Sequence, residues 1–219
     1  DMRNLSKDLF LNTMTCPTLG WELRNDDISG HGSQFPRTLG EKFRVEQGID
    51  IGNRARSLFP TGLLIEEKDM ARAAAATRQA MEDPRILTIF EAAFFVDSTA
   101  ARADILIRDG TGWSLIEVKS SANDRGNYID DMAYTAMVLT QAGLVITSAS
   151  LLLISKEFRL GMDNRDLFVE EDHTDEVLLH AEALRQQWPH IIDETSGPEK
   201  PRPVLKFECK KCSLFSECS

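Results

Sequence analysis

The sequence feature that most limits the possible folds is a pair of strand-like runs joined by a tight turn. Residues 103–108 and 113–119 are rich in apolar residues, and Asp109-Gly110-Thr111-Gly112 lies between them. Asp-Gly between two such runs is a strong hairpin signal, because the favoured hairpin turns need positive φ angles that glycine adopts readily. Apolar residues fall on both faces of the two runs. This pattern predicts a buried central hairpin.

The rest of the chain alternates between helical and strand-like patterns. Strands are expected at residues 86–96 and 144–154, and helices at residues 6–14, 39–58, 68–82, 128–142 and 173–188. Residues 195–203, which are rich in Pro, Gly and charge, are expected to be an exposed connection. We therefore predict an α/β fold, with a small mixed sheet flanked by helices, in one domain over residues 1–219.

Composition limits where this chain can act and what it can bind. The net charge of −10 argues against a broad basic surface for nucleic acid, so any such contact must be local. No run approaches the roughly 18 apolar residues of a membrane span, and the N-terminal residues do not have the order of a signal peptide. We expect a soluble, cytoplasmic protein without a membrane partner, in a reducing compartment where structural disulfides are disfavoured.

Charged residues on the predicted hairpin form the pattern D…E-x-K. Glu117 and Lys119 fall on one face of their strand, and pairing Arg108 with Trp113 places Asp104 directly opposite Glu117. Two carboxylates in such positions repel unless a cation lies between them. Mg²⁺ or Mn²⁺ would fit this role, and a partly buried Lys119 with a lowered pKa could orient or deprotonate a water molecule. The alternative is a merely solvated, charged strand surface.

The chain has four cysteines, and their spacing is uneven. Cys209, Cys212 and Cys218 lie close together near the C-terminus, whereas Cys16 is remote from them. Four thiols in a reducing compartment point to a metal or a cluster. Zinc and a 4Fe–4S cluster both accept four cysteines, but structural zinc sites usually draw on two local pairs. The alternative is four unrelated buried cysteines.

The D…E-x-K hairpin and the elements around it resemble the RecB-like branch of the PD-(D/E)XK nucleases, which have a restriction-endonuclease-like core. The resemblance implies that Asp104, Glu117 and the carbonyl of Val118 bind a divalent metal ion, and that Lys119 is the catalytic lysine. Glu91 matches a glutamate that precedes the hairpin in this family. It either assists the metal through water or pairs with a nearby arginine.

Two positions depart from the family pattern. Members of this family usually have a helix with the pattern Q-x-x-x-Y. In this chain Asp130 occupies the position of the glutamine, so the resemblance implies only Tyr134 as a nucleic-acid contact. The alternative is that Tyr134 is an ordinary aromatic residue of the core. Many members also have a metal-binding histidine where this chain has Arg56. Arginine does not ligate cations, so Arg56 either contacts a phosphate bidentately or packs its stem on the core.

The cysteine arrangement resembles the iron–sulfur RecB-like nucleases found in CRISPR-associated adaptation enzymes and AddB-type helicase-nucleases. The resemblance implies a 4Fe–4S cluster that clamps Cys16 to residues 209–218, and a Mg²⁺- or Mn²⁺-dependent exodeoxyribonuclease that prefers single-stranded DNA ends, with protein partners in a DNA repair or defence complex. Two alternatives stay open. One is a non-cutting nucleic-acid-binding or assembly module, and the other is a zinc-stabilised interaction domain whose acidic hairpin is incidental.

Overall fold

The computed structural model of this chain describes residues 5–25, 39–123, 126–212 and 214–218. They form two compact units. The core unit is Phe35–Leu184, and the terminal unit combines Asp1–Gln34 with Arg185–Ser219. The sequence predicts a single domain, whereas the chain packs as two units, with the N-terminal and C-terminal segments in the same one.

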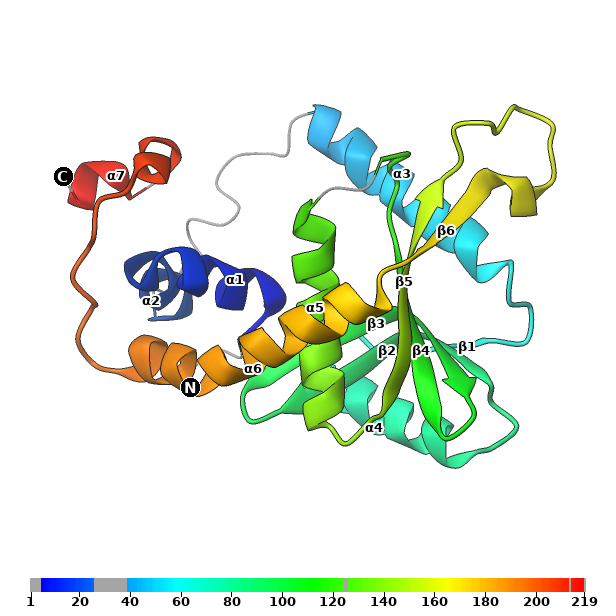
Figure 1. Ribbon diagram of the computed structural model, residues 1–219, viewed down its shortest axis with the longest axis horizontal. Helices are drawn as coiled ribbons and strands as arrows, with labels where there is room; N and C mark the ends of the chain where they lie inside the picture. Colours follow the sequence, from blue (N-terminus) through cyan, green and yellow to red (C-terminus); the bar gives the residue numbers. More distant parts are fainter. Residues whose placement is uncertain (1–4, 26–38, 124–125, 213, 219) are drawn as a thin grey trace. The chain divides into compact units, whose positions relative to one another are not determined.

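The core unit contains one mixed, six-stranded sheet (Figure 1). The strands lie in sequence order: β1 (Leu63–Leu64), β2 (Thr88–Val96), β3 (Thr99–Asp109), β4 (Gly112–Val118), β5 (Ile146–Ile154) and β6 (Phe168–Asp172). β1–β2 and β4–β5 are parallel pairs, and the other neighbours are antiparallel. The helices are α3 (Leu39–Arg56), α4 (Met70–Glu82), α5 (Gly126–Gln141), the short 3-10 helix η1 (Asn164–Leu167) and the first part of α6 (Thr174–Ser196). The α/β class and the mixed sheet flanked by helices agree with the prediction.

The predicted hairpin is the centre of this sheet. β3 and β4 pair in the expected register, with Arg108 opposite Trp113. Gly110 takes a φ of 57° in the turn, which is the conformation that its lack of a Cβ permits. The Arg108 guanidinium lies 4.4 Å from the centre of the Trp113 ring, so a cation–π contact reinforces the pair next to the turn.

A second hairpin joins β2 to β3 without a glycine. Asp97 and Ser98 take φ values of 41° and 73° between the paired residues Val96 and Thr99. Positive φ at both central residues is the signature of a type I′ turn, whose twist matches that of the flanking strands. This turn sets the register of β2 against β3, and that register determines which residues face each other at the candidate site.

Helices cover the sheet and bury its apolar residues. α4 is attached to β2 through Thr77, whose buried hydroxyl accepts a hydrogen bond from the Ala93 N–H at 2.9 Å. α5 packs against β2, β3 and β5 and buries nine of its residues. A cluster on one face contains Ala55 of α3 with residues of four strands: Phe90, Ile105, Ile116 and Leu152. The middle of the sheet is therefore covered and largely free of water.

Short helices and an extended C-terminal segment make up the terminal unit. It contains α1 (Lys7–Thr15), α2 (Pro17–Asn25), the last turns of α6, the 3-10 helix η2 (Phe207–Lys211) and α7 (Phe215–Cys218). Side chains of α2 bind the backbone that follows α6: Thr18 donates to the Pro201 carbonyl at 3.1 Å, and Trp21 to the Gly197 carbonyl at 2.8 Å. Such contacts connect segments that are distant in sequence.

Three elements differ from the sequence prediction. A second helix, α2, begins at Pro17, beyond the helix predicted at residues 6–14, because proline is well tolerated at a first helical position, where no N–H is needed. α6 runs through Pro189 to Ser196, so the expected connection starts later. β6 lies in a strongly acidic segment that gave no strand signal.

In the described ranges, no helix is both long and apolar enough to cross a membrane.

Candidate active site

Three carboxylates are aligned across neighbouring strands of the core unit. The pairs on either side of Glu91 place it opposite Asp104 on β3, and the pair next to Asp104 places that residue opposite Glu117 on β4. The predicted juxtaposition of Asp104 and Glu117 thus follows from the observed register. A row of like charges is destabilising in a sheet unless other groups compensate it.

Glu91 has an unusual backbone conformation within β2. Its φ is 54°, in the left-handed region that residues other than glycine seldom adopt. Such a conformation costs on the order of 1–3 kcal/mol and clusters at functional sites. The Glu91 carboxylate lies 3.6 Å from the Arg56 guanidinium, with both side chains partly exposed. Of the two roles expected for Glu91, the structure contains the pairing with an arginine.

Asp104 lies deeper, and its environment disfavours its charge. Burial, then the negative charge of Glu117 and more weakly that of Glu91, raise the pKa of Asp104 to about 8. The Val118 N–H, which donates to Asp104 Oδ2 at 2.8 Å, and the Lys119 ammonium act in the opposite direction. This carboxyl therefore keeps its proton to a higher pH than an ordinary aspartate does. The site is short of positive charge.

Lys119 lies between two carboxylates. Its Nζ is 2.9 Å from Glu117 Oε1 and 2.9 Å from Asp131 Oδ2, and it lies 4.9 Å from the centre of the Tyr128 ring. Burial lowers the pKa of Lys119, but the charges and hydrogen bonds of Glu117 and Asp131 outweigh it and raise the pKa. The lowered pKa expected from the sequence is therefore wrong for this arrangement. Lys119 is a cation over the whole neutral range.

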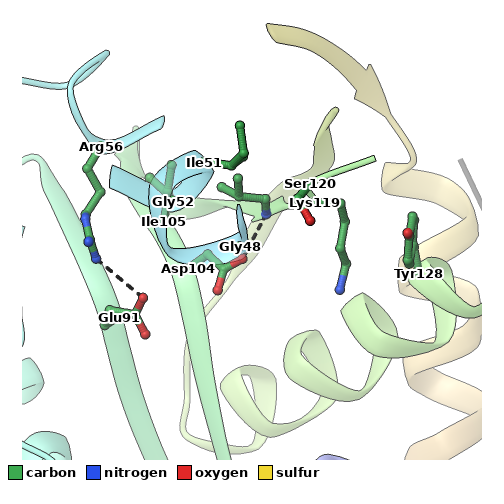
Figure 2. Close-up of a pocket in the computed structure, with 11 residues that line it drawn as sticks. Gly48, Ile51, Gly52, Arg56, Glu91, Asp104, Ile105, Lys119, Ser120 and Tyr128 are labelled. Carbon is green, nitrogen blue, oxygen red and sulfur yellow. Dashed lines mark hydrogen bonds and ion pairs between the residues drawn. The ribbon is translucent and has the colours of Figure 1, made fainter. Parts of the chain in front are cut away.

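Five of the side chains described above line one pocket of about 260 Å³ (Figure 2): Arg56, Glu91, Asp104, Lys119 and Tyr128. Figure 2 shows Arg56 and Glu91 at one end of this pocket and Tyr128 at the other, with Asp104 and Lys119 between them. α3 contributes Gly48 and Gly52, and a Cβ added to either would meet nothing within 4 Å. The pocket is thus open on its α3 side and lined by both acidic and basic groups.

The donor set suits a divalent cation of the magnesium type. In the part of the chain that the structure describes, no three His, Cys, Asp or Glu side chains converge closely enough to enclose a metal ion. Mg²⁺ does not need such a cage, since it is usually held by one or two carboxylates and keeps several waters. Asp104 and Glu117 supply two carboxylates, and the raised pKa of Asp104 reflects a buried negative charge that a cation would offset.

The helix after the hairpin presents different residues to the pocket from those the sequence indicates. Tyr134 is 0% exposed, and its hydroxyl donates to the Ala100 carbonyl at 3.1 Å, so it is a core aromatic and the predicted nucleic-acid contact is wrong. Asp130 is exposed, with its carboxylate 3.3 Å from His180 Nδ1. Tyr128 lines the pocket, and Asp131 reaches Lys119. Sequence reasoning missed both, although their spacing of three places them on one helix face.

All four cysteines belong to the terminal unit. The pKa of the Cys218 thiol is raised by burial and by the charges of Cys16, Cys212 and Cys209, while Lys200 lowers it. The sulfurs of the other three cysteines therefore lie within electrostatic reach of Cys218, although among the described residues no three cysteines converge closely enough to hold a metal ion. In addition, Cys209 Sγ accepts the Lys206 N–H at 3.2 Å.

The fold and the site define an α/β protein with a row of three carboxylates, two of them largely buried, beside a charged lysine. No protein-family model matches the chain, and no curated protein matches it. The crystal structure of LHK-Exo in complex with dAMP is similar over 88% of this chain and 90% of that one, with 12% identity and a TM-score of 0.39. The crystal structure of SSO0001 is similar over 80% of each chain, with 15% identity and a TM-score of 0.32. At these TM-scores, neither similarity supports a conclusion about fold or activity.

Proposed function

We propose that this chain is a metal-dependent nuclease of the PD-(D/E)XK class, RecB-like branch, which hydrolyses DNA phosphodiester bonds from single-stranded ends. The observation that carries the proposal is the row of Glu91, Asp104 and Glu117 across three adjacent strands, beside a pocket that Glu91, Asp104 and Lys119 line. Carboxylates can hold a divalent cation that assists phosphodiester hydrolysis, and a lysine beside them can orient the attacking water.

In this proposal, each residue of the pocket has a separate role. Asp104 and Glu117, with the Val118 carbonyl, would hold Mg²⁺ or Mn²⁺. The bound ion would supply Lewis acidity and lower the pKa of a water molecule. Because Lys119 is held as a cation, it would donate a hydrogen bond to the attacking water or to a phosphate oxygen, and would not act as a general base. Arg56 would contact a phosphate at the other end of the pocket.

A cleavage assay with end-labelled single-stranded DNA, double-stranded DNA and RNA tests this proposal directly. We expect progressive shortening of single-stranded DNA in Mn²⁺ and none in EDTA. A specific observation favours a second candidate, the non-cutting nucleic-acid-binding module: the Glu91 carboxylate is paired with the Arg56 guanidinium at 3.6 Å. Binding of DNA without cleavage in either Mn²⁺ or Mg²⁺ would establish that module and remove the nuclease.

We expect Arg56→Ala to weaken DNA binding and to reduce the salt dependence of binding. Loss of one phosphate contact should lower the slope of log K against log salt by about 0.7 for a single strand. Arg54→Ala is the matched control, because Arg54 lies on the same helix but pairs with the exposed Asp50 and does not line the pocket. Binding would be measured by fluorescence anisotropy from low to high salt. An equal slope for wild type and Arg56→Ala would return Arg56 to a packing role.

We also propose that Cys16, Cys209, Cys212 and Cys218 are the ligands of a 4Fe–4S cluster. Four thiolates are a suitable donor set for such a cluster, and the electrostatic effect of the other three on Cys218 supports their proximity. The terminal unit is also held together by other groups, since Lys206 Nζ donates to the Thr15 carbonyl at 3.1 Å next to Cys16. The cluster would join segments that are already in contact.

The expected result for anaerobically purified protein is broad visible absorbance, with about four irons and four sulfides per chain. Cys218→Ser should lose most of this absorbance, whereas Ser216→Ala, at an exposed position of the same short helix, should keep it. A colourless protein that contains zinc would overturn the cluster and favour a structural zinc site. Metal analysis of the same samples distinguishes the two.

A further inference from the structure

We propose that Asp131 is the positioning residue for Lys119, holding its ammonium group in the pocket independently of Glu117. The D…E-x-K pattern does not predict a role for Asp131. This residue lies on α5, and only the packing of that helix places it near Lys119. The inference rests on the proposed nuclease function, because it assigns Asp131 a part in the same reaction.

The geometry shows that the Lys119 ammonium is bound by two carboxylates, those of Glu117 and Asp131. Both carboxylates lie 2.9 Å from Lys119 Nζ, and the side chains of Lys119, Glu117 and Asp131 are 17%, 6% and 21% exposed. At these exposures, hydrogen bonds between charged groups are stronger and less screened than at a surface. Figure 2 shows the Lys119 side chain extending toward α5, the helix that carries Asp131.

The backbone alone does not fix this lysine. Lys119 follows the last residue of β4, and its N–H donates to the Leu152 carbonyl at 3.1 Å, which holds the main chain at the strand end. The side chain beyond it is long and flexible, with many rotamers. A second anchor, from another element, is needed to keep the ammonium within reach of a reacting atom.

Glu117 cannot be that anchor throughout the reaction. If its carboxylate binds a divalent cation, its oxygens turn toward the ion and its hold on the ammonium weakens. Asp131 then remains as the carboxylate in contact with Lys119 Nζ, with the Tyr128 ring at one side. An ammonium has three N–H donors, so engagement by Asp131 still leaves donors for a water molecule and a phosphate oxygen.

The neighbouring residue on α5 offers a matched control. Asp130 has the same side chain and the same helical environment, but it is exposed and lies beside His180 instead of Lys119. Asp130→Asn and Asp131→Asn therefore make the same change in charge and volume, one residue apart. Any difference between them comes from what each carboxylate contacts.

The experiment compares single-turnover cleavage of single-stranded DNA in Mn²⁺ with DNA affinity, for Asp131→Asn, Asp131→Glu and Asp130→Asn. We expect Asp131→Asn to slow cleavage by roughly 10- to 100-fold, the scale of a misplaced catalytic group, while DNA affinity changes by less than about twofold. Asp131→Glu should recover most of the rate, and Asp130→Asn should match wild type. In a Lys119→Ala background, Asp131→Asn should have no further effect.

Equal rates for Asp131→Asn and Asp130→Asn, or an undiminished effect of Asp131→Asn without Lys119, would overturn the inference.

A double-mutant cycle of Lys119 and Asp131 on urea unfolding gives a readout that does not depend on cleavage. If the wild type cuts no substrate but the cycle gives a favourable coupling, the nuclease proposal fails and the contact stands. If the wild type cuts and the cycle gives no coupling, Asp131 does not hold Lys119. Circular dichroism confirms folding, and Asp131→Glu serves if Asp131→Asn does not fold.

Discussion

Replacing Asp104 with asparagine is expected to abolish Mn²⁺-dependent cleavage and, at the same time, to make the metal-free protein harder to unfold at pH 8. The loss of function follows because asparagine removes one of two anionic ligands of the proposed cation. The gain in stability follows because asparagine keeps an acceptor for the Val118 N–H but removes a carboxyl whose charge is disfavoured by burial and by Glu117.

The sign of the pH dependence follows from the raised pKa. Between the ordinary value of 3.8 and about 8, folded Asp104 keeps a proton that the unfolded chain releases. The folded state then binds more protons, so the wild-type free energy of unfolding falls as pH rises through this window. Each pKa unit corresponds to about 1.4 kcal/mol, and we expect the advantage of Asp104→Asn to grow from near zero at pH 4 to on the order of 2–5 kcal/mol above pH 8.

Urea unfolding at pH 5 and pH 8, each in EDTA and in Mn²⁺, measures both effects. Mn²⁺ should stabilise the wild type and leave Asp104→Asn nearly unchanged, because only a protein that binds the ion gains stability from it. Asp109→Asn, at an exposed position on the same strand, is the control for cleavage and metal binding. A wild type whose stability is the same at both pH values in EDTA would show that Asp104 is not held protonated.

Lys119→Ala should separate catalysis from metal binding. Removal of the ammonium should lower the single-turnover rate by roughly 10²- to 10³-fold, the usual scale for the loss of one preorganised hydrogen-bond donor. Mn²⁺ affinity should persist or increase, because a positive charge next to Glu117 is removed. The variant should also be less stable, by on the order of 1–3 kcal/mol, since Glu117 and Asp131 would face each other without the ammonium between them.

The part of this loss that comes from the charge of Lys119 itself should not vary between pH 6 and pH 9. The folded pKa of Lys119 is raised above its ordinary 10.5, so its contribution is complete below that value and is lost only at strongly alkaline pH. A smaller part should grow as pH rises through about 8, because the Lys119 ammonium also lowers the pKa of Asp104. Calorimetric Mn²⁺ titration and single-turnover cleavage are the measurements, with the exposed Lys156→Ala as control. Wild-type cleavage by Lys119→Ala would show that the lysine of the D…E-x-K pattern is not part of the reaction.

The hairpin and its two carboxylates could be predicted because the signal is local. The glycine-containing turn fixes the pairing of β3 and β4, and counting outward from it places Asp104 opposite Glu117. Glu91 could not be placed in this way. Its position depends on the β2–β3 turn, where Asp97 and Ser98 adopt positive φ without glycine and so give no turn signal.

The rotation of α5 about its axis could not be predicted from a motif. Spacing selects Asp130 and Tyr134, but the packing of the helix on the sheet buries Tyr134 and turns Asp131 toward Lys119. Tertiary packing also explains β6. Three of the five residues in its sequence, FVEED, are acidic and have low strand propensity. It becomes a strand because it pairs with β5 while its acidic side chains face solvent.

The left-handed backbone of Glu91 has a consequence for anyone who engineers this chain. Glycine would relieve the strain at φ 54°, so a screen for heat resistance should enrich Glu91→Gly. The same substitution would delete the carboxylate that meets Arg56. Directed evolution that selects only for heat resistance would therefore tend to remove the Glu91 carboxylate from the pocket. Position 91 should be kept unchanged in libraries built on this protein.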